Sequence, residues 1–166
     1  MKVNIALLTV TDTRTFDNDK SGAILVEKIK ASNHNLLDRK ICKDNKDEIV
    51  VILKDWLQND KLDVIITTGG TGLTGRDVTP EALEEIADKR IPGFGELFRQ
   101  LSYKNVGTST LQSRACAILR NGKYIFSLPG SSGGVTDAWD MILKNQLDIN
   151  HKPCNFVELF PRLKEK

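Results

Sequence analysis

Cysteine and histidine are scarce in this chain. Its three cysteines, Cys42, Cys116 and Cys154, stand far apart without a C-x-x-C pair, so neither a disulfide framework nor a zinc site is indicated. We expect reduced thiols, with Cys116 a small core residue of an apolar strand. The two histidines, His34 and His151, have no neighbouring residues of metal-binding type, which favours solvated or structurally hydrogen-bonded side chains.

The sequence also lacks long hydrophobic runs and blocks of like charge. The apolar run at residues 3–10 is too short for a signal peptide or a membrane span, and Asn4 and Thr9 interrupt it. The 24 Lys and Arg residues are interleaved with 22 Asp and Glu residues, for a net charge of +2. This pattern argues against a nucleic-acid binder and a membrane protein, and we expect a cytoplasmic location.

Length and composition fit one domain. Of the 166 residues, 40% are hydrophobic and 28% are charged, a usual balance for a globular protein with a substantial core. Apolar, β-branched runs alternate with amphipathic stretches, which predicts a mostly parallel sheet with helices on both faces. We expect a single domain over residues 1–166, in which residues 148–166 form a C-terminal tail.

The expected elements follow one another along the chain. Strands are predicted at residues 5–10, 36–41, 62–66, 114–120 and 123–128. Helices are predicted from about residue 21 and at residues 44–59, 80–88, 94–103 and 135–147. The Asn121-Gly122 pair between the last two strands predicts a tight hairpin. One antiparallel pair should therefore join the parallel sheet.

Residues 67–82, TTGGTGLTGRDVTPEA, lead from an apolar strand into the start of a helix. Glycines permit positive φ angles and close backbone approach, so that successive N–H groups can converge on an anionic group. We expect this conformation at Gly69, Gly70, Gly72 and Gly75. A tight connection without a ligand is the alternative interpretation.

Two charged side chains distinguish this loop from a plain turn. Arg76 offers a forked, permanently charged donor for phosphate. Asp77 beside it would repel a bare phosphate and therefore favours a bridging divalent cation such as Mg²⁺. The stretch has neither the P-loop pattern nor the dinucleotide-binding fingerprint. It predicts a different kind of site for a phosphorylated ligand with a metal.

Three further loops should converge with this one, because ligands of open α/β sheets bind beyond the carboxyl ends of the parallel strands. These loops are residues 11–19, 43–45 and 129–134. Asp44 is either a second metal-binding carboxylate or the cap of the following helix, and Ser131 and Ser132 are either ligand contacts or turn residues. The candidate substrate-binding residues are Thr11, Asp12, Gly69, Gly70, Thr71, Gly72, Arg76, Pro129, Gly130, Ser131 and Ser132.

Several segments resemble one known family. GGTGLTGRDVTPEA at residues 69–82, IPGFGELFR at 91–99, GTSTLQSRA at 107–115 and LPGS at 128–131 are similar to the MogA/MoaB family of molybdenum cofactor biosynthesis proteins. The GTSTLQSRA spelling and PCNF at 153–156 are closer to the MoaB branch. The resemblance spans nearly the whole chain. It implies a three-layer α/β/α molybdopterin-binding domain with a mostly parallel sheet and one antiparallel hairpin.

The resemblance also implies a chemistry. The MogA branch transfers AMP from ATP to the phosphate of molybdopterin, and two aspartates that this branch associates with magnesium and nucleotide transfer match Asp77 and Asp44. Our leading hypothesis is a molybdopterin adenylyltransferase in which these carboxylates hold Mg²⁺, while Arg76 and the glycine-loop amides stabilise phosphate oxygens. The alternative is a non-catalytic carrier or scaffold that holds molybdopterin or a partner enzyme of the pathway. A phosphate-binding domain for another nucleotide is a third hypothesis.

Two apolar clusters predict self-association. One consists of Ile91, Phe94, Leu97 and Phe98, and the other of Val157, Leu159 and Phe160. Together they provide more apolar surface than one chain is expected to cover. The family resemblance implies trimers, or a trimer-of-dimers hexamer for the MoaB-like branch. We therefore expect a homo-oligomer with a threefold axis.

Overall fold

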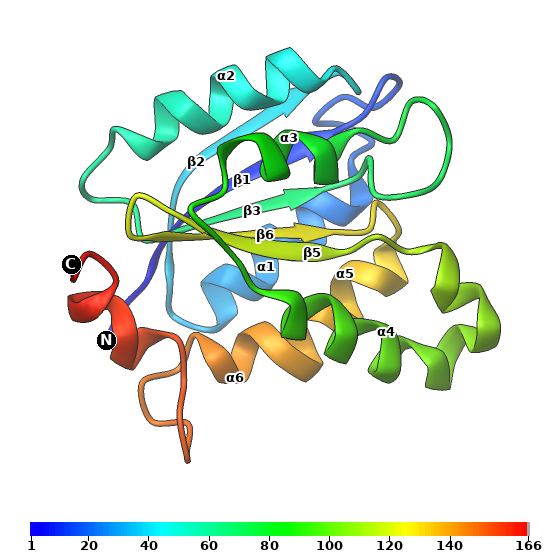
Figure 1. Ribbon diagram of the computed structural model, residues 1–166. Helices are drawn as coiled ribbons and strands as arrows, with labels where there is room; N and C mark the ends of the chain where they lie inside the picture. The colour runs from blue at the N-terminus through cyan, green and yellow to red at the C-terminus, as the bar shows by residue number, and fades with distance from the viewer. Residues whose placement is uncertain (166) are drawn as a thin grey trace.

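A six-stranded sheet runs through the molecule, with helices on both faces (Figure 1). The computed structural model describes residues 1–165. The strand order is β2-β1-β3-β6-β5-β4. The strands are β1 (Asn4–Val10), β2 (Asn35–Cys42), β3 (Val64–Thr68), β4 (Lys89–Arg90), β5 (Cys116–Arg120) and β6 (Lys123–Leu128). This arrangement confirms the expected three-layer α/β/α fold.

The sheet is parallel except around β5, which runs antiparallel to both of its neighbours. Asn121 and Gly122 make the turn between β5 and β6, with φ angles of 50° and 69°. Two successive positive φ angles give a two-residue turn the twist that hairpin strands require, and the predicted hairpin is confirmed. β4 was not predicted, because Lys89 and Arg90 carry no strand pattern and become a strand only by pairing with β5.

Helices alternate with the strands as expected. They are α1 (Lys20–Ala31), α2 (Lys46–Leu57), α3 (Thr79–Ile86), α4 (Pro92–Val106), the 3-10 helix η1 (Gly107–Gln112), α5 (Ser132–Ala138), the π-helical turn η2 (Trp139–Leu143), α6 (Lys144–Gln146) and the 3-10 helix η3 (Val157–Arg162). α5 begins earlier than predicted because the Ser131 hydroxyl caps it, accepting a hydrogen bond of 3.1 Å from the Gly134 amide. None of the helices between residues 1 and 165 is long and apolar enough to cross a membrane.

Apolar side chains fill the spaces on both sides of the sheet. α2 and α3 cover one face, and α1, α4 and α5 cover the other (Figure 1). Leu7 and Leu8 in β1 belong to opposite faces, and both are fully buried, as is usual for a central parallel strand. Trp139 is 1% exposed and lies within the core. The loops after the parallel strands therefore rest on a rigid frame.

The two apolar clusters that were expected to form a subunit contact lie mainly inside the chain. Phe94, Phe98 and Val157 are at most 3% exposed. Leu97 and Leu159 are 42% and 44% exposed, respectively. Most of the two clusters therefore covers the core of its own chain, and Leu97 and Leu159 are the members that remain exposed.

The C-terminal segment folds over the start of β6. The Tyr124 ring packs against the rings of Phe156 and Phe160, with centroids 4.7 and 5.7 Å apart. The Tyr124 hydroxyl also donates a hydrogen bond of 3.3 Å to the Phe156 carbonyl oxygen. In Figure 1 this segment lies beside the N terminus, away from the loops at the carboxyl ends of the parallel strands. The predicted tail is thus a packed part of the domain.

The burial of the cysteines and the hydrogen bond of His34 can be compared with what the sequence predicted. Burial raises the pKa of Cys42 to about 12 and that of Cys116 to about 11, so both thiols stay protonated at neutral pH. Cys116 is half-buried and Cys154 is exposed. His34 accepts a hydrogen bond of 3.2 Å from the Val3 amide at its Nδ1. His34 thus has the structural hydrogen bond that was one of its two expected environments.

Candidate functional site

Four loops meet at the carboxyl ends of the parallel strands, and the loop after β1 contacts the other three. Asp12 accepts hydrogen bonds from the Arg76 side chain after β3 and, at 3.2 Å, from the Asp44 amide after β2. Arg14 donates to the Gly130 carbonyl oxygen after β6 at 3.0 Å. The loops therefore converge as expected. Arg14 is a contact that the sequence did not reveal, because only the fold brings it beside Gly130.

The glycine loop turns at its first two glycines. Gly69 and Gly70 have φ angles of 101° and 66°, in the region that favours glycine. A Cβ atom on Gly69 would lie 2.1 Å from the Val10 carbonyl oxygen, so the loop passes β1 too closely for any side chain. Gly72 and Gly75 do not have positive φ angles, and the expectation of positive φ at these two positions was wrong. The chain has already turned before it reaches them.

Beyond this turn, the loop closes around its own carboxylate. The Thr74 amide and hydroxyl donate hydrogen bonds of 2.9 and 2.6 Å to Asp77 Oδ2. Burial raises the pKa of Asp77, but hydrogen bonds from Thr74 and from the Gly72 amide outweigh burial and hold that pKa below its usual value. A Cβ atom on Gly72 would lie 2.8 Å from Asp77 Oδ2, which explains the glycine without a positive φ. Loop amides expected to bind phosphate therefore bind Asp77 here.

Arg114 supports the same loop through its backbone carbonyls. Its Nε donates to the Gly72 carbonyl oxygen at 2.7 Å, and its Nη2 donates to that of Asp77 at 2.8 Å. The Arg114 amide donates to the Thr71 carbonyl oxygen at 2.9 Å. Glu81 pairs with the guanidinium group. Arg114 lies in the GTSTLQSRA segment, but nothing in the sequence connects that segment with the glycine loop, so this role was missed.

Arg76 is paired with Asp12. Its Nε and Nη2 donate to the two carboxylate oxygens of Asp12 at 3.0 and 2.9 Å, in a forked geometry. The hydrogen bond from Arg76 is the main reason why the pKa of Asp12 is lowered. The side chains are 65% and 36% exposed, and exposed pairs contribute little to stability. The pair therefore contributes little to the stability of the fold.

Asp44 is not the cap of α2. Asn45 precedes the helix, and its Oδ1 accepts a hydrogen bond of 3.1 Å from the Glu48 amide. The helix-cap interpretation of Asp44 was therefore wrong. Asp44 is half-buried; burial, followed by repulsion from Asp12 and Asp77, raises its pKa. A neighbouring cation would relieve this repulsion.

Charged groups of both signs surround the loops. Asp12 and Asp77 both raise the pKa of Asp44, so the three carboxylates lie close together. Arg76 pairs with Asp12, whereas Lys43 and Arg114 lie close enough to lower the pKa of Asp12 and of Asp77, respectively. Within residues 1–165, no group of three or more His, Cys, Asp or Glu side chains is arranged to hold a metal ion. Mg²⁺ usually takes one or two protein carboxylates and completes its shell with water and substrate phosphates. The donors here thus fit Mg²⁺ bound together with a phosphorylated ligand.

A pocket of about 820 Å³ lies beside the glycine loop, between the turn at residues 129–134 and the segment formed by α4 and η1. Its volume is in the usual range of small-molecule sites. The predicted residues that line it are Gly70, Thr71, Gly72, Asp77, Pro129, Gly130 and Ser131. Ser131 lines the pocket and also caps α5, so both interpretations of this residue apply. Ser132 does not line this pocket.

A second pocket, of about 630 Å³, lies between the loop after β1 and α2. Thr11, Asp12 and Arg14 line one side of it, and Val51 and Ile52 provide apolar surface from α2. Asp12 faces this second pocket, whereas Asp77 lines the first. Each pocket is therefore lined by one carboxylate of the loops, and Asp44, which interacts with both, lines neither pocket.

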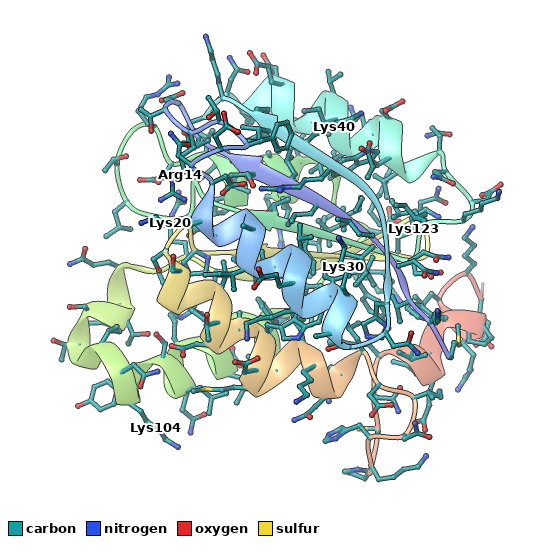
Figure 2. The ribbon with its side chains drawn as sticks, turned by 180° about the vertical axis from the view of Figure 1, so that it is seen from behind. Arg14, Lys20, Lys30, Lys40, Lys104 and Lys123 are labelled. Atoms are coloured by element: carbon teal, nitrogen blue, oxygen red, sulfur yellow. The ribbon has the colours of Figure 1, made fainter. Side chains whose placement is uncertain are left out.

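The basic residues labelled in Figure 2 are spread over the molecule. Arg14 and Lys20 lie at the end of the sheet where the four loops meet, and Lys123 lies at the opposite end. Lys40 lies beside α2, whereas Lys104 lies on α4, across the sheet. This distribution agrees with the interleaved charges of the sequence.

Known proteins are similar to most of this chain. The family described as "Probable molybdopterin binding domain" matches residues 6–149. Molybdenum cofactor biosynthesis protein B from Escherichia coli (strain K12) is 43% identical over 161 residues, which cover 97% of this chain and 93% of that protein. The protein of the same name from Staphylococcus aureus (strain MRSA252) is 49% identical over 149 residues, which cover 88% of each chain.

A solved structure shares the fold over the full length of the chain. The crystal structure of a molybdenum cofactor biosynthesis protein B has a TM-score of 0.89 and 37% sequence identity, and the match covers 100% of this chain and 98% of that one. Sequence and structure agree on the same group of proteins. The chain therefore belongs to the molybdopterin-binding domain family of molybdenum cofactor biosynthesis proteins.

Proposed function

We propose that this protein transfers AMP from Mg-ATP to the terminal phosphate of molybdopterin. The observation that carries this proposal is that Asp12 lines a pocket of about 630 Å³, Asp77 lines a pocket of about 820 Å³, and the charges of both act on Asp44. A reaction between two large substrates needs a place for each, with the reacting phosphates held between them. Membership of a molybdopterin-binding family supports the pterin as one of the two.

The proposed reaction needs no nucleophilic side chain. An oxygen of the molybdopterin phosphate forms a bond to the α-phosphorus of ATP, and the bond from this phosphorus to the oxygen of the leaving pyrophosphate breaks. Positioning and charge neutralisation provide most of the rate enhancement in reactions of this kind. Mg²⁺, when bound, would neutralise charge on the triphosphate, and Asp44 and Asp77 are the residues that would hold it.

Arg76 has an exchangeable partner in this scheme. The forked donor of Arg76 now binds Asp12, and a phosphate presents oxygens of similar charge and spacing. Because the pair is exposed, the exchange costs little. Arg76 is thus available to stabilise phosphate oxygens once the nucleotide is in place.

A carrier or scaffold that holds molybdopterin without transferring AMP is the second candidate. It is favoured by the internal pairing of the site: Arg76 is bound to Asp12, and the Thr74 donors are bound to Asp77. In a carrier these pairs are permanent parts of the loops. In the enzyme, the pair with Asp12 must open during each turnover.

Incubation of the purified protein with molybdopterin, ATP and Mg²⁺ separates the two candidates. The enzyme produces adenylylated pterin and pyrophosphate, whereas the carrier binds molybdopterin and produces neither. Asp44→Asn removes one proposed metal ligand and should stop transfer. Asp55→Asn is the matched control, because Asp55 is an exposed carboxylate of α2 that pairs with Lys40 outside both pockets.

A further inference from the structure

The larger pocket has a polar end that the proposed reaction does not use. Asp137 of α5 and Asn105 of α4 line it there, with the buried Ser102 beside them. Figure 1 shows α4 alongside α5 on the same side of the sheet. The glycine loop and the turn at residues 129–134 form the other part of the same pocket. A single ligand can therefore contact both parts at once.

Asp137 is a half-buried carboxylate whose orientation is set by one neighbouring side chain. The Asn105 Nδ2 atom donates to both of its oxygens, at 2.9 and 3.0 Å. Between residues 1 and 165, Asp137 takes part in none of the salt bridges. An ionised carboxylate accepts about four hydrogen bonds, so Asp137 keeps acceptor capacity for a ligand in the pocket.

The chemistry of a carboxylate selects one kind of ring edge. Because both oxygens of Asp137 only accept hydrogen bonds, they match two adjacent N–H donors on a ligand. The pyrimidine edge of a pterin has this pattern, formed by the ring N3–H group and the 2-amino group. Adenine instead presents an amino donor next to a ring-nitrogen acceptor, a pattern that suits the amide of Asn or Gln. Asp137 therefore favours a pterin over an adenine ring.

The spacing along α5 agrees with this assignment. Ser131 caps α5 at the part of the pocket that adjoins the glycine loop, and Asp137 lies six residues further on. Six helical residues rise about 9 Å. A fused three-ring pyranopterin with a phosphate on a methylene arm has a comparable length. The phosphate can lie near the loop amides while the pyrimidine edge reaches Asp137.

We propose that Asp137 recognises the pyrimidine edge of the pterin through paired hydrogen bonds, and that Asn105 is the positioning residue that orients its carboxylate. The inference rests on the proposed function for its ligand, but it concerns binding and does not require AMP transfer. It assigns a specificity-determining residue to the larger pocket. It also distinguishes the pterin end of that pocket from the end that holds phosphate.

Ring-edge preference can be measured with 6-hydroxymethylpterin and 6-hydroxymethyllumazine, which carries an oxygen acceptor in place of the 2-amino donor. Fluorescence titration should show that the wild-type protein binds the pterin about tenfold more tightly than the lumazine. Asp137→Asn replaces one acceptor by a donor and should abolish or reverse this preference. Asp140→Asn is the matched control, because Asp140 pairs with Lys28 and does not line the pocket.

A second variant keeps the test independent of folding. Asn105→Ala removes the orienting donor and should lower pterin affinity without reversing the preference, and melting temperatures should be recorded for each variant. Unchanged pterin affinity in Asn105→Ala, or a wild-type preference in Asp137→Asn, would overturn the proposal. If Asp137→Asn alters the ring preference but the wild-type protein transfers no AMP, this inference is supported and the proposed enzyme activity is contradicted. If the wild-type protein transfers AMP but Asp137→Asn keeps the wild-type preference, the enzyme activity is supported and this inference is contradicted.

Discussion

Thr74 and Asp77 are joined by two hydrogen bonds: the Thr74 amide and hydroxyl both donate to Asp77 Oδ2, at 2.9 and 2.6 Å. The carboxylate that the proposed reaction needs is therefore also the group around which the glycine loop closes. An asparagine at this position would keep one acceptor, lose the charge and add two donors. The structure of the loop and the chemistry of the site thus depend on one side chain.

Asp77→Asn should retain the fold and abolish Mg²⁺-dependent AMP transfer, because the substitution keeps the shape of the side chain and removes the charge that recruits the metal. Thr74→Val keeps that charge while it removes one hydrogen bond, so its rate should fall by only about tenfold. Rates of adenylylated pterin formation and thermal melting curves measure both effects. A wild-type rate in Asp77→Asn would exclude this carboxylate from the reaction.

Three glycine substitutions should have different effects on stability. Gly69→Ala places a Cβ atom against the Val10 carbonyl oxygen at positive φ and should destabilise the fold by about 2 kcal/mol or more. Gly72→Ala should displace Asp77 and weaken ligand binding with a smaller loss of stability. Gly75→Ala has no atom within 4 Å of its new methyl group and should stay within about 0.5 kcal/mol of wild type. Urea unfolding tests this ranking, and equal losses at all three positions would contradict it.

Asp44→Asn should make the folded protein more stable at pH 7. The pKa of Asp44 is raised on folding by burial and by repulsion from Asp12 and Asp77, so the ionised form is disfavoured in the folded state. This penalty appears as the pH rises above the unfolded pKa of about 3.9, is complete above the folded pKa, and is absent when both states are protonated. Melting temperatures should therefore differ at pH 7 and converge near pH 3.

Magnesium provides an internal check on that prediction. Mg²⁺ bound near Asp44 would relieve the repulsion and stabilise the wild-type protein more than the variant. The gap between their melting temperatures should then narrow when the ion is added at pH 7. An Asp44→Asn protein that melts below wild type at pH 7 would show that this carboxylate makes a stabilising contact instead.

Asp12→Asn should release Arg76 and remove one negative charge from the site. Pyrophosphate without metal should then bind about tenfold more tightly, as measured by calorimetry in the presence of a chelator. Most of the gain should disappear in the double variant with Arg76→Met, which has no guanidinium to release, and the remainder measures the removed charge of Asp12. If pyrophosphate affinity does not rise in Asp12→Asn, Asp12 does not restrict access to Arg76.

Self-association is still expected from the family resemblance, although most members of the apolar clusters pack inside the chain. Static light scattering at micromolar concentration should give a mass of about three or six times the 18.5 kDa of one chain. A hexamer should dissociate through trimers or dimers on dilution. Only the 18.5 kDa species at every concentration would contradict the prediction.

Much of the fold could be predicted because local patterns specify it. The spacing of Ile49, Leu53 and Trp56 predicted α2, and the Asn121-Gly122 pair predicted the hairpin. Boundaries were less accurate where a cap decides them. Asn45, rather than Asp44, caps α2, and the sequence alone could not decide between them because both residue types are common N-caps.

The contacts inside the site could not be predicted, because they join residues that are distant in sequence. Arg76 and Asp12 are 64 residues apart, and Arg114 reaches Gly72 across 42 residues. The sequence predicted which charged and polar residue types each loop contributes, but it could not predict which charged side chains would pair. Asp137 was missed for a similar reason, since only the packing of α4 against α5 places it in a pocket.

The shortness of β4 has a consequence for how copies of this chain can meet. β4 ends one edge of the sheet with two exposed, charged residues, Lys89 and Arg90. A strand so short and so charged offers a poor template for pairing with a strand of another molecule. The β4 edge is therefore protected against edge-to-edge aggregation. A helix surface such as the one on α4 that exposes Leu97 and Tyr103 is better suited to contacts between copies than this edge.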